Sequence, residues 1–110
     1  MTCEAQEKNG ATVVSLSGEI DLQTSPDVRR FLLKSLSQGK SLVVDMSAVG
    51  YIDSSGIASL VEAYQTARKM GLRFALAQVG PSAMRVFQLA RLDRVFTIFP
   101  SVDAALQDHA

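Results

Sequence analysis

The residue types that could do chemistry are concentrated in the stretch Tyr51–Ile57, which reads YIDSSGI. Asp and Ser are common helix N-caps, so the simplest interpretation of this stretch is the start of a helix. A cap needs only one side chain, and if Asp53 supplies it, a serine hydroxyl remains close to the helix N-terminus, which favours anions. Gly56 is interpreted as leaving room for another molecule. The pattern therefore suits a serine that is presented to a kinase as a phosphate acceptor.

An alternative chemistry for these serines is nucleophilic catalysis, and the sequence argues against it. Neither Ser54 nor Ser55 lies in the G-x-S-x-G pattern of hydrolases. The single histidine, His109, is the penultimate residue, so no internal histidine is present to act as a base. Glycine-rich phosphate-binding loops are also absent from the sequence. We therefore predict a protein that is not an enzyme and has no cofactor, so that any ATP must be held by a partner.

Two further carboxylates, Glu19 and Asp21, follow a strand-like run in the segment GEID. A turn with solvated charges is the simplest interpretation. Paired acids also bind Mg²⁺ in phospho-aspartate receiver domains, where Asp45, after the apolar run 42–44, would resemble the acceptor. Receiver domains share a Lys after the last strand, but residues 95–99 of this chain, the last strand-like run, read VFTIF and contain no Lys. Receiver chemistry is therefore disfavoured.

The elements that must position these residues alternate between strand and helix patterns. Asn9-Gly10 between two strand-like runs indicates a hairpin. Later strand-like runs are separated by amphipathic segments of helical period, which indicates right-handed crossovers and parallel strands. Strands are predicted at 2–8, 11–17, 42–44, 72–79 and 95–99, and helices are predicted to begin at 24–27, 53–56, 80–82 and 100–101. We predict one α/β domain, residues 1–110, with a mixed, mostly parallel sheet, an N-terminal hairpin and about four helices.

Composition restricts the class of protein. The chain has 110 residues, is 47% hydrophobic, and balances eleven Lys plus Arg against eleven Asp plus Glu. It lacks the basic excess of a nucleic-acid binder. The lone Cys3, without His or Cys at ligand spacing, argues against a zinc site. No signal peptide is visible, and no apolar run approaches the ~20 residues that span a bilayer. We predict a cytoplasmic protein without metal, direct nucleic-acid binding or membrane insertion.

In their order and spacing, these motifs resemble the STAS domain family, and within it the small stand-alone anti-sigma-factor antagonists of bacteria. Residues 18–21, GEID, are similar to the first signature of the family. Residues 43–56, from VVDM to YIDSSG, are similar to its second and more specific signature. The segments 84–87 and 92–96 are similar to the C-terminal third. One departure is Arg91, where the family usually has Gly; a left-handed Arg would cost about 1 kcal/mol relative to Gly.

The resemblance implies a partner-switching mechanism. The unphosphorylated antagonist binds an anti-sigma factor that is also an ATP-dependent serine kinase, and the sigma factor is released. The kinase phosphorylates the first serine after the motif's Asp, here Ser54, with Ser55 as the second candidate, and the phosphorylated form dissociates. A metal-dependent phosphatase of the PP2C type restores it. The expected partner-binding residues are Glu19, Asp21, Met46, Asp53, Ser54, Ser55, Gly56 and Ile57. For Met46 and Ile57, core packing is at least as good an interpretation, and Tyr51 is expected to pack.

Charge is consistent with such a switch. A phosphate adds about −1.5 to −2 charges at pH 7, Asp53 is adjacent to Ser54, and no Lys or Arg is close in sequence. From the family fold, Glu19 and Asp21 are expected nearby. Residues 1–55 hold five Lys plus Arg against seven Asp plus Glu, whereas residues 56–110 hold six against four. The new charge would therefore meet repulsion at an interface in the acidic half of the chain.

A second function is compatible with the same fold, namely an accessory STAS subunit of a membrane transporter for lipids or anions. Such subunits share the fold and can keep the acidic-serine loop, but the complete GEID and DSSG segments favour the antagonist.

Overall fold

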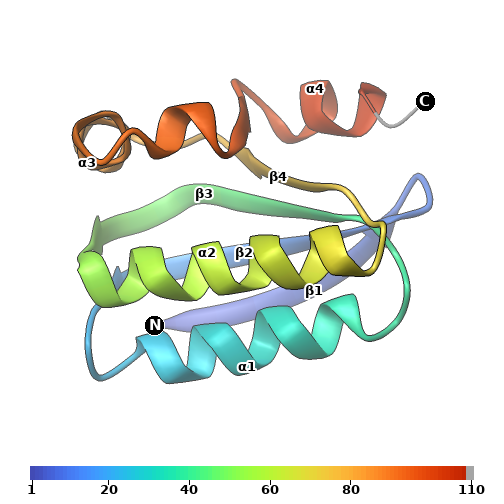
Figure 1. The fold of residues 1–110 in the computed structure, drawn as a ribbon, viewed down its shortest axis with the longest axis horizontal. Helices are drawn as coiled ribbons and strands as arrows, with labels where there is room; N and C mark the ends of the chain where they lie inside the picture. Colours follow the sequence, from blue (N-terminus) through green and yellow to red (C-terminus); the bar gives the residue numbers. More distant parts are fainter. Residues whose placement is uncertain (109–110) are drawn as a thin grey trace.

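The computed structural model describes residues 1–108, and His109 lies outside them. The strands are β1 (Thr2–Lys8), β2 (Ala11–Ile20), β3 (Leu42–Ile52), β4 (Phe74–Ala77) and β5 (Thr97–Phe99). The helices are α1 (Ser25–Leu36), α2 (Ser54–Lys69), α3 (Pro81–Leu89) and α4 (Val102–Gln107), with a short 3₁₀ helix at Leu92–Arg94. The strands form one sheet in the order β1-β2-β3-β4-β5 (Figure 1). Only β1 runs antiparallel to its neighbour, so the predicted α/β fold with a mixed, mostly parallel sheet is confirmed.

The N-terminal hairpin has the predicted turn. Lys8 pairs with Ala11, and Asn9 and Gly10 between them both have positive φ, 54° and 80°. Positive φ at both central positions is the geometry that matches the twist of the flanking strands and that favours Asn-Gly. The hairpin places β1 at one edge of the sheet.

The two faces of the sheet bury different side chains. Large residues of β2, β3 and β4 pack with α1, α2 and α3 into the main core, to which Leu60 and Phe87 contribute from the helices. On the other face, Val13, Val43 and small alanines pack against Ala105 and Leu106 of α4. In Figure 1, α1 and α2 run side by side in front of the sheet, and α3 lies near the end at which α2 begins. The three crossover helices thus share one face, as right-handed crossovers between sequential parallel strands require.

The predicted strand boundaries were wrong at the end of the sheet where the candidate site lies. β2 continues from residue 17 to Ile20, and β3 continues from residue 44 to Ile52. The extensions pair with each other, with Glu19 opposite Tyr51 and Ile20 opposite Ile52. The register shifts twice along β2 before these pairs, between residues 15 and 17 and between residues 18 and 19. These segments mix small, polar and glycine residues, so they lack the apolar period that identifies strands. Conversely, β4 and β5 are shorter than predicted.

Arg91 adopts the left-handed conformation, with φ 60° and ψ 22°, directly after α3. The backbone there has the geometry for which Gly is the usual residue, so Arg carries a steric cost. We expect Arg91→Gly to raise the free energy of unfolding by up to about 1 kcal/mol in urea denaturation, part of the gain being offset by the greater entropy of Gly in the unfolded chain. Arg94→Gly is the matched control, because Arg94 does not have positive φ, and it should destabilise. Equal effects of the two substitutions would contradict this account.

Candidate functional site at the start of helix α2

The ends of β2 and β3 bring the two acidic loops together. Ile20 and Ile52 are register partners, and the backbone N–H of Asp53 donates to the carbonyl oxygen of Ile20 at 3.1 Å. Asp21 and Asp53, which each follow one of these isoleucines, are therefore on adjacent loops at the carboxyl edge of the parallel strands. The expectation that the GEID and DSSG segments lie near each other is met by this pairing.

Asp53 is the N-cap of α2, as predicted. Its Oδ1 accepts hydrogen bonds from the backbone N–H groups of Ser55 at 2.9 Å and of Gly56 at 3.1 Å. The next N–H group, that of Ile57, donates to the backbone oxygen of Asp53 at 3.0 Å. The N–H groups of residues 55–57 are thus already used by one residue, which leaves fewer donors for an added anion than the sequence suggested.

The two candidate acceptor serines differ in environment. Ser54 is exposed, and within residues 1–108 its hydroxyl makes no hydrogen bond. Ser55 is half-buried, its N–H is bonded to Asp53, and its carbonyl oxygen accepts a bond from the hydroxyl of Ser59 at 3.2 Å. Of the two hydroxyls, that of Ser54 is the more accessible to another protein.

Gly56 does not leave room for another molecule, and that interpretation was wrong. The residue is buried, and a Cβ built on it would lie 2.6 Å from Cγ2 of Ile20 and 2.7 Å from Cγ1 of Ile52. Both contacts are closer than real Cβ atoms show. Gly56 therefore allows α2 to approach the ends of β2 and β3 of its own sheet, and this approach sets the position of Ser54.

Asp21 organises the loop before α1. Its Oδ1 accepts from the N–H groups of Gln23 and Thr24, each at 3.0 Å, and from the hydroxyl of Thr24 at 3.2 Å. The expectation that a Thr or Ser side chain caps α1 is not met, since the Thr24 hydroxyl bonds back to residues 19–21 instead. The pKa of Asp21 is lowered below its ordinary value, mainly by the hydrogen bond from the backbone N–H of Thr24.

The lowered pKa of Asp21 predicts a pH dependence of stability. A carboxylate whose pKa is depressed in the folded state stabilises that state above its ordinary pKa, and the contribution is lost as pH falls through the folded value. Asp21→Asn should therefore unfold at a lower temperature than the wild type at pH 7, and the difference should shrink below about pH 4. Thermal unfolding followed by circular dichroism between pH 7 and pH 2 measures this. Glu19→Gln is the control, because that exposed carboxylate accepts no hydrogen bond within residues 1–108.

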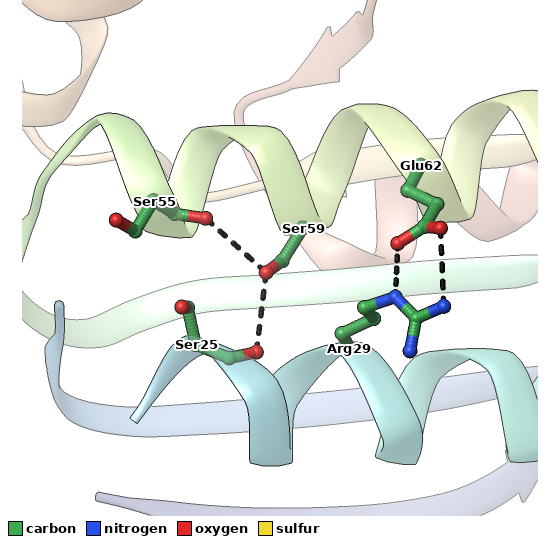
Figure 2. Close-up of polar contacts among 5 residues, drawn as sticks. All are labelled: Ser25, Arg29, Ser55, Ser59 and Glu62. Atoms are coloured by element: carbon green, nitrogen blue, oxygen red, sulfur yellow. Dashed lines mark hydrogen bonds and ion pairs between the residues drawn. The ribbon is translucent and has the colours of Figure 1, made fainter. Parts of the chain in front are cut away.

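Helices α1 and α2 are tied together beside the site by contacts that the sequence analysis missed (Figure 2). The buried hydroxyl of Ser59 lies 3.1 Å from the carbonyl oxygen of Ser25, in addition to its contact with Ser55. One turn further on, Arg29 forms a two-pronged ion pair with Glu62, which lowers the pKa of Glu62 through the side-chain hydrogen bond. The sequence analysis assigned no role to these residues; the signal that could have found Ser59 is its helical spacing to Ala63 and Ala67 on the buried face of α2.

The remaining predicted residues are not equally available to a partner. Met46 is 1% exposed and belongs to the main core, so it does not reach the surface. Ile57 is half-buried against that core, and Glu19 is exposed. Tyr51 was expected to pack but is 53% exposed, and Leu22, in the Asp21 loop, is 74% exposed. Two large apolar side chains therefore accompany Ser54 at this end of the molecule.

Comparison with known proteins agrees with the fold and the placement of these motifs. Residues 2–105 match the STAS domain. The chain belongs to the STAS domain family. This STAS chain is 30% identical to the anti-sigma-F factor antagonist RsfB of Mycobacterium tuberculosis, over 96% of its own length and 87% of RsfB. It is 27% identical to the anti-sigma-B factor antagonist of Bacillus subtilis, over 86% of each chain.

A solved structure is similar as well. The crystal structure of an anti-sigma factor antagonist from Mycobacterium paratuberculosis superposes with a TM-score of 0.90, at 32% identity, over 97% of this chain and 92% of that one. The likeness therefore extends over most of this chain and of each of these relatives, and is not confined to a shared motif.

Within residues 1–108, no three His, Cys, Asp or Glu side chains gather where they could hold a metal ion. No helix in the same range is long and apolar enough to cross a membrane. Burial raises the pKa of the Cys3 thiol, which makes this cysteine less reactive at neutral pH.

Proposed function

We propose that this STAS protein is an anti-sigma-factor antagonist that binds its partner through the end of the molecule defined by the Asp21 loop and the start of α2. The observation that carries the proposal is the geometry of Ser54, an exposed hydroxyl on the first residue of a helix whose cap is already supplied by Asp53. Full-length similarity to stand-alone antagonists such as RsfB supports the same function. The partner is an anti-sigma factor, and binding it releases the sigma factor.

Phosphorylation of Ser54 switches the antagonist off. The phosphate adds about −1.5 to −2 charges beside the Asp53 carboxylate, and the N–H groups of Ser55 and Gly56 are already bonded to Asp53. The new charge therefore gains no hydrogen bond from these two groups and faces the partner. In an interface, an anion without a partner charge suffers both repulsion and desolvation.

The proposed cycle needs two further proteins. An anti-sigma factor with serine kinase activity brings ATP and transfers its γ-phosphate to the Ser54 oxygen, releasing ADP and the hydroxyl proton. A PP2C-type phosphatase hydrolyses the phosphoserine and restores the hydroxyl. Both enzymes act in the cytoplasm, where sigma factors and the polymerase are found, so the antagonist is proposed to work there.

The deciding experiment uses purified antagonist with an anti-sigma factor kinase from the same genome. Incubation with ATP, followed by phosphosite mass spectrometry, should find one phosphate on Ser54. Titration calorimetry should show that the unmodified form binds the kinase and that the phosphorylated form binds much more weakly. Phosphate on Ser55 alone would move the acceptor by one residue, whereas no complex and no phosphate transfer with any such kinase would refute the proposal.

A further inference from the structure

Ser59 is a buried polar residue, 6% exposed, whose hydroxyl lies between helices α1 and α2 (Figure 2). Its Oγ is 3.1 Å from the carbonyl oxygen of Ser25 and 3.2 Å from the carbonyl oxygen of Ser55. A serine hydroxyl has a single proton to donate, and a carbonyl oxygen inside a helix can still accept a second hydrogen bond. One buried donor therefore serves two acceptors, one on each helix.

The two contacts of Ser59 make different demands on the fold. The Ser55 carbonyl is four residues back in the same helix, and it is a common acceptor for a helical serine. The Ser25 carbonyl is thirty-four positions earlier and belongs to the first residue of α1. This second contact exists only while the first turns of the two helices keep their relative position.

The same contacts connect the two acidic loops. The N–H of Ser25 donates to the carbonyl oxygen of Asp21 at 2.8 Å, and the N–H of Ser55 donates to Oδ1 of Asp53 at 2.9 Å. Ser59 joins these two pairs, because it donates to the carbonyls of Ser25 and Ser55. A continuous set of hydrogen bonds therefore runs from the Asp21 loop to the cap of α2.

Two buried links restrict the movement of α2 relative to α1 and the loop before it. At the strand ends, the N–H of Asp53 donates to the carbonyl oxygen of Ile20. Ser59 supplies the second link six residues further along the chain, about 9 Å along a helix axis. Links this far apart prevent a tilt that either one alone would allow. The ion pair of Arg29 and Glu62 adds to them, but it is nearly half exposed, so salt weakens it.

We infer that Ser59 is a positioning residue, whose hydroxyl holds the first turn of α2 against α1 so that Ser54 and the Asp21 loop form one preformed surface for the anti-sigma factor. The inference rests on the proposed function and adds a residue buried within the protein to those on which binding depends. A surface that must be ordered when the complex forms binds more weakly than a preformed one. Loss of the hydroxyl should therefore raise the Kd although the contact residues themselves are unchanged.

The test compares Ser59→Ala with Ser35→Ala, a matched control on α1. Ser35 is also 6% exposed, and its hydroxyl donates to the carbonyl oxygen of Phe31, four residues back, but within residues 1–108 it makes no hydrogen bond to a second helix. Both variants should unfold at similar urea concentrations. Only Ser59→Ala should raise the Kd for the kinase that binds the wild type, by about three- to tenfold, which corresponds to the loss of one hydrogen bond.

A second pair of variants separates the hydroxyl from the size of the side chain. Ser59→Thr keeps the hydroxyl, and Ser59→Val replaces it by a methyl group in a side chain of similar shape. Crowding by the added carbon is therefore common to both variants. Ser59→Thr should bind the kinase at least about threefold more tightly than Ser59→Val.

Hydrogen exchange of the backbone amides of residues 55–57, measured by NMR, reports on the start of α2 without any partner. Local opening of a segment sets the exchange rates of its amides. In Ser59→Ala these amides should therefore exchange faster than in the wild type, whereas in Ser35→Ala they should exchange at close to the wild-type rate.

The outcomes distinguish the positioning role from the proposed function. Unchanged exchange in Ser59→Ala would overturn the positioning role whether or not a partner is bound. Faster exchange with an unchanged Kd would also overturn it, and would leave the proposed function standing. Failure of the wild type to bind any anti-sigma factor of its genome would overturn the proposed function, and the positioning role with it, even if the exchange rates differ as expected.

Discussion

Ser54→Asp is expected to bind the anti-sigma factor about 100-fold more weakly than the wild type while folding normally. The substituted residue is exposed and takes the first helical position of α2, where a carboxylate is well tolerated by the helix dipole. The loss arises at the interface, since a second negative charge beside Asp53 must be desolvated opposite the partner. A penalty of about 3 kcal/mol corresponds to roughly 100-fold in Kd. Titration calorimetry measures the affinity, and circular dichroism melting checks the fold.

Ser54→Ala separates binding from modification. It removes a hydroxyl that makes no hydrogen bond within residues 1–108, so the complex should form with a Kd close to that of the wild type, and no phosphate should be incorporated. Ser55→Ala is the matched control and should remain a kinase substrate. If Ser54→Ala still took up phosphate and Ser55→Ala did not, the switch would belong to the half-buried serine. If Ser54→Asp bound as tightly as the wild type, charge at this position would not control the complex.

The arrangement of the molecule could be predicted from local signals where these are strong. Asn9-Gly10 indicates the hairpin, and the apolar runs separated by amphipathic segments indicate the parallel crossovers, since both signals depend only on neighbouring residues. Asp53 could be assigned as a cap for the same reason. These features occur in the sequence in the same order as the hairpin, strands and helices that they predict.

The site itself depends on contacts between distant segments, and these were predicted less well. Gly56 was predicted to leave space for another molecule, because glycine has no side chain. In the structure that space is occupied by side chains of the same chain, one of which, Ile20, lies thirty-six positions earlier. The ion pair between Arg29 and Glu62 likewise joins two residues that each have the period of a solvated face. The length of β3 also escaped prediction, because its second half is paired only through the equally irregular end of β2.

The similarity to RsfB extends over 96% of this chain, and neighbouring residues within the shared segment have separate roles. Asp53 fixes the helix start, Gly56 sets its distance from the sheet, and Ser54 is left exposed by both. The acceptor is therefore held by rigid elements and not by a mobile loop, which favours a switch in which charge changes and the backbone does not. Small shifts of α2 should then also affect the switch, because they move Ser54.

Gly56→Ala tests that conclusion and is expected to lower the free energy of unfolding by about 1–3 kcal/mol. The new methyl group would lie 2.6 Å and 2.7 Å from side-chain carbons of Ile20 and Ile52, which are 0% and 5% exposed and have little room to move. The free-energy cost of this overpacking should exceed the gain of about 1 kcal/mol in helix propensity that Ala brings relative to Gly. To relieve it, the first turn of α2 must move away from the sheet, so phosphorylation of Ser54 should also slow.

Gly50→Ala provides the control for Gly56→Ala. Gly50 lies in β3, close in sequence to the site, and a Cβ on it would have no atom within 4 Å. Its effect on stability should stay within about 0.5 kcal/mol, as for ordinary surface substitutions. Urea denaturation gives the free energies, and initial rates of phosphate incorporation under saturating ATP give the effect on the switch. If Gly56→Ala matched Gly50→Ala in both measurements, the close approach of α2 to the strand ends would not be what positions Ser54.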